Sequence, residues 1–292
     1  MGLLSTITWL LVPLMMVTLV VRAYPILVEH SISELLLSIN WHPIEGAFGF
    51  FPFIVSTLWV TGVAMIVATP LSLLTAIYLA EYARPRTRGL VMPVIDLLAG
   101  IPSVVYGVWG MLIIVPFVQN YLAPLLSSSF AFVPLFKSSN PTGYGILAGG
   151  LVLAVMVLPI IISVSEEIIR TVPAGLREAS LSLGATRWQT IKLVILRRSR
   201  SGVFAAVVLG LSRAFGETMA ILMVVGNVVQ VPHSIFDAAY PLTALIANNY
   251  GEMMSIPLYD AALMAAALIL LLVVLTFNLA SRLVLMRLTN HA

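Results

Sequence analysis

Residues 166–202 read EEIIRTVPAGLREASLSLGATRWQTIKLVILRRSRSG and separate two long apolar runs of the chain. The segment holds seven of the fifteen Lys and Arg residues of a protein that is 60% hydrophobic. Cations gathered in one connection of a membrane protein usually lie on the cytoplasmic side of the bilayer. The segment therefore predicts a membrane protein with a large, structured loop inside the cell, of the kind that a protein partner binds.

The composition of the whole chain favours the same class. Charged residues make up 9% of the chain, against roughly 25% in an ordinary soluble domain. The net charge of +3 does not indicate nucleic acid as a partner, because the cations cluster near membrane boundaries. The absence of cysteine excludes disulfides, thiolate metal sites and cysteine nucleophiles.

Six stretches are apolar over a length that can cross the hydrocarbon core, which takes about 20 residues. They are residues 3–21, 53–79, 90–118, 144–164, 203–225 and 261–285. No basic region precedes the first stretch, so we interpret it as a retained span rather than a secretory signal. We thus predict an all-α membrane protein with six transmembrane helices in a single domain over residues 1–292.

Prolines and cations refine this topology. Pro70, Pro93 and Pro102 fall within the second and third stretches, which we expect to be tilted, kinked or partly unwound. Twelve of the cations lie in connections or tails on one side of the predicted membrane, whereas only Arg22 and Lys137 lie on the other. This bias predicts that both termini are cytoplasmic.

An amphipathic helix is predicted over residues 31–40 on the outer side, where Ser31 and Glu34 have the spacing of a capping box. Aromatic residues suited to a membrane interface follow it, namely Trp41, Phe48, Phe50 and Phe51.

Signatures of an enzyme are missing from the sequence. The chain has no Gly-x-x-x-x-Gly-Lys phosphate loop, and its four histidines lack metal-ligand spacing. No Ser/His/acid grouping stands out within a span. We therefore expect no catalytic residue, metal or cofactor in this chain.

The fifth stretch carries two charges, Arg213 and Glu217, near the predicted middle of the membrane. Charges at that depth cost roughly 2.5–3.5 kcal/mol each on insertion scales and usually face a protein interior or a wet cavity. In a continuous helix, residues four apart share one face. Two interpretations have equal weight: an internal salt bridge that fixes helix packing, or a guanidinium that binds a passing oxyanion while Glu217 neutralises it at other times.

The third stretch has small residues at intervals of three or four together with one carboxylate: Asp96, Gly100, Ser103, Gly107 and Gly110. Close helix packing is the favoured explanation, because small residues mark helix contacts in membranes. Pairing of Asp96 with Arg213 or another cation is the alternative.

The loop motif resembles a known family. Glu178, Ala179 and Gly184, with the residues between them, resemble the EAA loop of bacterial ABC importer permeases. Three further stretches are similar to the PstC-type permeases of phosphate importers: residues 100–110, 213–220 and 225–227. One departure is visible, since Leu196 is followed by Arg197 where the family usually has proline.

The resemblance implies a type I ABC importer permease fold in the inner membrane, with the loop docked into a cytoplasmic ATPase. It also implies a second, related permease subunit, two copies of the ATPase that binds ATP, an external phosphate-binding protein and surrounding lipid. In this family the Arg and Glu that match Arg213 and Glu217 are implicated in moving phosphate. The matching Glu178, Ala179 and Gly184 would couple the chain to the ATPase.

Three alternatives stay open. A permease for sulfate, molybdate or phosphonate would suit one Arg–Glu pair equally well. An ion-coupled secondary carrier would have little use for the loop, and no inverted repeat is visible between residues 1–141 and 142–292. A passive anion channel would need no ATPase-binding loop either.

Overall fold

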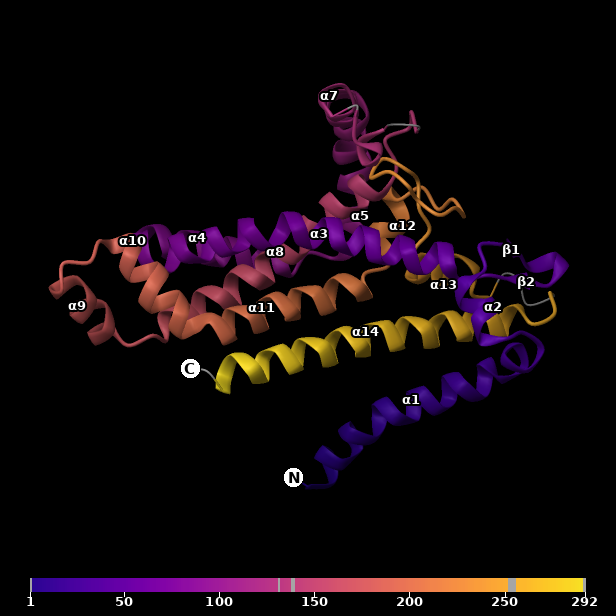
Figure 1. Cartoon of the computed structure of the whole chain (residues 1–292), viewed down its shortest axis with the longest axis horizontal. Coiled ribbons are helices and arrows are strands. Elements are labelled where there is room, and N and C mark those ends of the chain that lie inside the picture. The colour runs from indigo at the N-terminus through magenta and orange to yellow at the C-terminus, as the bar shows by residue number, and fades with distance from the viewer. Residues whose placement is uncertain (1, 131, 138–139, 252–255, 291–292) are drawn as a thin grey trace. The chain divides into compact units, whose positions relative to one another are not determined.

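The computed structural model describes residues 2–130, 132–137, 140–251 and 256–290, and these residues are mostly helical (Figure 1). They form two compact units. The first unit comprises Met1–Val60, Gly107–Gly149 and Thr218–Thr276. The second unit comprises Thr61–Tyr106, Gly150–Glu217 and Phe277–Ala292.

The regular elements are helices, with one small hairpin of strands. The hairpin pairs β1 (Trp41–His42) with β2 (Ala47–Phe48) in antiparallel register. The α-helices are α1 (Gly2–Glu29), α2 (Ile32–Leu37), α3 (Phe51–Ile77), α4 (Pro85–Ala99), α5 (Ser103–Trp109), α6 (Val115–Phe117), α7 (Ala123–Ser129), α8 (Ile146–Arg170), α9 (Ala174–Ser182), α10 (Arg187–Thr190), α11 (Leu196–Gly216), α12 (Met219–Val224), α13 (Leu242–Asn249) and α14 (Tyr259–Asn290). Four segments are π-helical: Tyr78–Tyr82, Gly110–Ile114, Val118–Leu122 and Ile191–Ile195.

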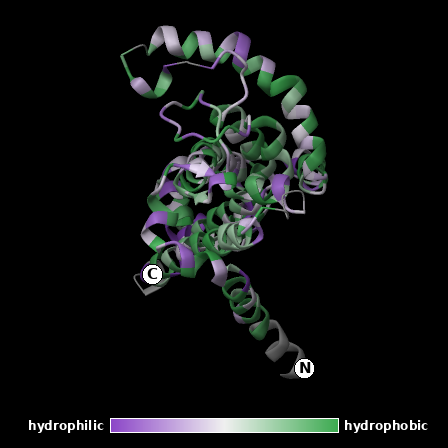
Figure 2. Cartoon of the chain, turned by 90° about the vertical axis from the view of Figure 1, so that its right-hand side faces the viewer, coloured by the Kyte–Doolittle hydropathy of each residue, from purple (hydrophilic) through white to green (hydrophobic). Residues whose placement is uncertain are grey.

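Five helices in the described part of the chain are long and apolar enough to cross a membrane, and most of the helical ribbon is hydrophobic (Figure 2). They are Leu10–Glu29, Phe51–Tyr82, Ser103–Ser129, Ile146–Arg170 and Tyr259–Arg287. Four of them overlap the first, second, fourth and sixth predicted stretches. The structure thus confirms an all-helical, multi-pass membrane architecture.

The predicted third stretch, residues 90–118, is not one helix. The helix α4 ends at Ala99, and a new helix begins at Ser103 and continues through π-helical turns to Ser129. Pro102 explains the break, because proline has no N–H to donate and disfavours helical backbone at the residue before it. Pro70 and Pro93 lie inside α3 and α4 without breaking them.

The predicted fifth stretch, residues 203–225, is also interrupted. The helix α11 ends at Gly216, and the short α12 begins only at Met219. Glu217 between them has extended backbone, with φ −74° and ψ 130°. Gly216 supplies a physical reason, since glycine is the weakest ordinary helix former apart from proline.

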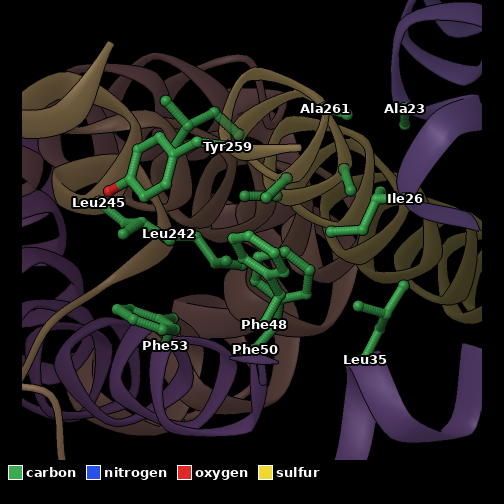
Figure 3. Close-up of a cluster of buried hydrophobic side chains, with 14 of the residues drawn as sticks. Ala23, Ile26, Leu35, Phe48, Phe50, Phe53, Leu242, Leu245, Tyr259 and Ala261 are labelled. Carbon is green, nitrogen blue, oxygen red and sulfur yellow. The ribbon is translucent and has the colours of Figure 1, made fainter. Parts of the chain in front are cut away.

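The core of the first unit gathers aromatic rings from distant segments (Figure 3). Phe48, Phe50 and Phe53 are almost fully buried there with Leu242 and Tyr259. Trp41 packs against this group, with its ring centroid 5.0 Å from that of Phe53 and 5.5 Å from that of Phe50. The interface position predicted for Phe48 and Phe50 was therefore wrong, because their rings fill the core. The amphipathic helix is confirmed as α2, whose Ser31 hydroxyl accepts a hydrogen bond from Glu34 N–H.

In the second unit, α11 packs closely on α8 through glycines. A Cβ added to Gly210 would lie 2.6 Å from Ile161 Cγ1, and one added to Gly202 would lie 2.6 Å from Ile168 Cγ2. The C-terminal half of α14 adds an aromatic contact, in which the ring centroids of Phe277 and Phe215 lie 4.9 Å apart. Small residues thus let the helix backbones approach, as is typical of membrane bundles.

Candidate functional site

The loop after α8 folds into a helical hairpin. The helices α9 and α10 are joined by a turn, and α10 runs through a π-helical segment directly into α11 (Figure 1). The hydroxyls of Ser180 and Thr190 lie 2.9 Å apart and link α9 to α10. Arg197 keeps its backbone N–H, unlike the proline expected from the resemblance, and the helix continues through it to Gly216 without a break.

Two local signals determine the turn of this hairpin. Gly184 has φ +84°, a left-handed conformation that side chains with a Cβ rarely adopt. Thr186 and Gln189 then form a capping box at the start of α10: the Thr186 hydroxyl accepts from Gln189 N–H, and the Gln189 side chain accepts from Thr186 N–H at 2.8 Å. Gly184 and the capping box together place the turn between α9 and α10.

The tip of the hairpin faces solvent. Leu183 is 89% exposed, and the neighbouring Glu178 and Ala179 are exposed as well. Leu181 and Trp188 add further exposed apolar surface on the same two helices. A compact helical tip with apolar and acidic side chains on its surface is suited to fit into a groove of another protein.

Two arginines hold the hairpin to the end of α3. Arg177 of α9 donates to both carboxylate oxygens of Glu81, with the shortest N–O distance 2.7 Å. Arg187 at the start of α10 donates to the Glu81 carbonyl, and its guanidinium lies 4.8 Å from the centroid of the Tyr82 ring. The carboxylate of Glu81 is 8% exposed, so this ion pair is largely shielded from water.

A second buried carboxylate lies between α4 and α8. Glu166 accepts hydrogen bonds from Arg88 and lies 3.7 Å from Arg170. The hydrogen bond to Glu166 raises the pKa of Arg88 above its ordinary value. These residues line a cavity of about 540 Å³ together with Asp96 and Ser163.

Asp96 and Ser103 do not share one helix face. Asp96 lies on α4 and accepts a hydrogen bond from Ser163 of α8 at 3.3 Å, whereas Ser103 begins α5 beyond the break. The hydroxyl of Tyr106 donates to the Leu98 carbonyl at 2.8 Å and so bridges the break. The prediction of one small-residue stripe over residues 96–110 is therefore wrong, because the helix is interrupted between Ala99 and Ser103. Gly107 nevertheless makes a close contact, since an added Cβ would lie 3.1 Å from Ala220 Cα.

The positions of Arg213 and Glu217 also differ from those expected in a continuous helix, where the two residues would share one face. Arg213 is in the last turn of α11, whereas Glu217 lies outside that helix, so the two do not share a helix face. Two glycines of the same helix, Gly202 and Gly210, pack against α8. The guanidinium of Arg213 is exposed, and none of the ion pairs among the described residues involves it. Arg213 interacts electrostatically with Tyr106, next to the break before α5.

A cavity of about 620 Å³ in the first unit was not predicted from the sequence. Its wall includes Asn140, Thr142, Asn227, Gln230 and Asp237. Asn227 has a positive φ of 52°, and its buried Oδ1 has no hydrogen-bond donor in the described part of the chain. No spacing in the sequence marks this group, because its members come from two separate connections.

Sequence reasoning also missed Glu81 and Glu166 as buried ion-pair partners. One signal was available: each is a carboxylate at the end of a long apolar stretch, with Glu81 standing alone and Glu166 next to Glu167. Their partners, however, are 96 and 78 residues away along the chain.

Comparison with known proteins assigns the class. The model of the family "Binding-protein-dependent transport system inner membrane component" matches residues 68–290. The chain belongs to this family of membrane components. It is similar in fold to the MetNI methionine ABC transporter in an inward-facing conformation, with a TM-score of 0.57 at 20% identity over 80% of this chain and 93% of that one.

Relatives with closer sequences are more specific. The chain is 39% identical over 251 residues to the phosphate transport system permease protein PstC of Pasteurella multocida, covering 85% of this chain and 78% of that protein. It is 34% identical over 285 residues to the PstC of Haemophilus influenzae, covering 97% and 90%. It is also 40% identical over 256 residues to the probable ABC transporter permease YqgH of Bacillus subtilis, covering 85% and 78%.

Proposed function

We propose that this chain is the permease subunit of an ATP-driven ABC importer for inorganic phosphate and forms half of the translocation pathway. The observation that carries the proposal is the 34–39% identity to proteins named as phosphate permeases over 85–97% of this chain. The exposed helical hairpin of α9 and α10 supports the same function, since an ion-coupled carrier would have little use for it and a channel would need no ATPase-binding loop.

The partners follow from the hairpin and the family. Glu178, Ala179 and Gly184 contact a cytoplasmic ATPase, which is present in two copies and binds the ATP. The exposure of Leu183 and Glu178 supports this assignment. A second, related permease completes the pathway, and an external protein delivers phosphate. Both termini are cytoplasmic, in agreement with the distribution of cations.

Arg213 contacts the passing oxyanion, and Glu217 limits how tightly it is held. An exposed guanidinium at the end of an interrupted membrane helix supports this role, because Arg presents a planar fork that matches phosphate oxygens. Weak binding is required, since a conducted ion must also leave. Asp96 and Ser103 serve packing on either side of the α4–α5 break, with the hydrogen bond from Ser163 to Asp96 in support.

Reconstitution tests the proposal. The chain, its partner permease and the ATPase are incorporated into liposomes with the binding protein outside, and uptake of labelled phosphate is measured. We expect uptake that requires ATP and is insensitive to excess sulfate or molybdate. Transport of sulfate instead would assign another oxyanion, and uptake that persists without ATP would indicate a channel or a carrier.

A further inference from the structure

The cytoplasmic end of α3 is bound from two sides by the hairpin. The π-helical segment Tyr78–Tyr82 ends α3 and carries Glu81, whose carboxylate and carbonyl bind different arginines. Arg177 reaches the carboxylate from α9, and Arg187 reaches the carbonyl from α10. We name this group of three residues the Glu81 clamp.

Arg177 makes more contacts than an ordinary ion pair. Besides Glu81, its Nη2 donates to the Ile169 carbonyl at 3.0 Å, and its Nη1 donates to the Val172 carbonyl. These carbonyls belong to the end of α8 and the connection that follows it. The guanidinium therefore ties three parts of the second unit together: α9, the end of α8 and the end of α3.

The clamp is shielded and reinforced. The side chains of Glu81 and Arg177 are 8% and 22% exposed, so water screens their attraction weakly. Apolar packing surrounds the same contact: Ile77 of α3, Ile169 of α8 and Ile191 after α10 are buried in one cluster. A displaced α9 would have to break charge-assisted hydrogen bonds or carry the end of α3 with it.

We infer that Glu81 is a coupling residue: its clamp transmits displacement of the hairpin to α3, a membrane-crossing helix. This inference rests on the proposed function, because it needs an ATPase that moves the hairpin. Glu81 acts through Arg177 and Arg187 and touches neither ATP nor substrate, so it is a positioning residue. Arg177→Lys keeps the charge but lacks the planar fork whose separate nitrogens reach Glu81 and the two carbonyls.

The first experiment measures motion and needs no substrate. The chain has no cysteine, so spin labels attach only at cysteines introduced at Leu74 on α3 and Ser182 on α9, both of which are exposed. Distances between the labels are measured in the assembled transporter without nucleotide and with ATP trapped. We expect the same distance in both states of the wild type, and a distance that changes with nucleotide in Glu81→Gln. An unchanged distance in Glu81→Gln would overturn the inference.

The second experiment measures coupling in liposomes. We expect Glu81→Gln to hydrolyse ATP while phosphate moved per ATP falls about tenfold, within the usual range of coupling between sites. Exchanging the charges in Glu81→Arg with Arg177→Glu should restore part of the ratio. The matched control is Arg88→Gln, which breaks another buried pair of the second unit without touching the hairpin and should retain the ratio.

The outcomes separate the two proposals. Parallel loss of ATP hydrolysis and uptake in Glu81→Gln would show that the clamp only maintains the structure, and would overturn the inference. An equal loss of the ratio in Arg88→Gln would overturn it too. Failure of the wild-type complex to move phosphate would contradict the proposed function, whereas the distance measurement would still decide the role of Glu81.

Discussion

Arg88 donates to both carboxylate oxygens of Glu166, at 2.6 and 3.2 Å, so a guanidinium on α4 binds a carboxylate of α8 that is only 2% exposed. The two helices are thereby joined at the ends of two apolar stretches. Arg170, one turn further along α8, lies 3.7 Å from the same carboxylate. A carboxylate buried to this extent depends on its partners to offset the loss of hydration.

Loss of this pair should destabilise the protein. Arg88→Gln leaves the Glu166 charge with Arg170 alone, and we expect a cost of about 1–3 kcal/mol, below the full value for a buried pair because Arg88 is partly exposed. The decrease in the thermal midpoint of the purified protein in detergent measures this loss of stability. The double change with Glu166→Gln should cost less than Arg88→Gln, and a larger cost would contradict the pairing.

The pH dependence of this contribution has a definite sign. The pKa of Arg88 is raised in the folded protein, so the stabilisation is fully present below the ordinary pKa of arginine and is lost only as the pH rises through the folded value. We expect the difference in thermal midpoint between wild type and Arg88→Gln to be the same at neutral pH and in mildly alkaline buffer. A difference that shrinks with mild alkali would argue against the ion pair.

Gly184 offers a test of the hairpin turn. An added Cβ would meet no atom within 4 Å, so the cost of substitution comes from φ +84° alone. For a residue other than glycine that cost is about 1–2 kcal/mol, while asparagine tolerates the conformation better. Gly184→Val should insert into the membrane normally but lose ATP-driven uptake and ATPase association, and Gly184→Asn should retain much of both. Equal activity of the two variants would contradict the role of the turn.

Arg213 can be tested separately from Glu217. Because α11 ends between them, removing Arg213 should not disturb a shared helix face, and Arg213→Gln should assemble at the wild-type level. We expect it to lose phosphate uptake, and Arg213→Lys to keep an intermediate rate because it retains charge without the planar fork. Adding Glu217→Gln to Arg213→Gln should not recover uptake. Near-normal uptake by the double variant would leave Arg213 only a structural role. The control is Arg282→Gln, which removes a cation from α14 and should leave uptake unchanged.

The orientation of the chain is accessible to cysteine labelling. Single cysteines at the exposed Glu45 and His233 should react with an impermeant reagent from outside intact cells. Those at the exposed Arg86 and Ser182 should react only after the membrane is opened. Labelling of the Ser182 position from outside would reverse the predicted topology and exclude a cytoplasmic ATPase partner for the hairpin.

The sequence alone determined the features that local chemistry controls. Apolar length located the membrane helices around Phe51–Tyr82, Ile146–Arg170 and Tyr259–Arg287, because each residue in the bilayer contributes its own transfer free energy. The turn at Gly184 was predictable because φ > 0 favours glycine whatever surrounds it.

The tertiary structure decided which side chains meet. Glu81 finds Arg177 across 96 residues, and Phe48 and Phe50 turn inward rather than toward the membrane interface. The interruption at Glu217 likewise separates two charges that the spacing of a continuous helix would have joined. Such pairings depend on how helices pack, and periodicity along one helix does not specify the neighbours that another helix brings to it.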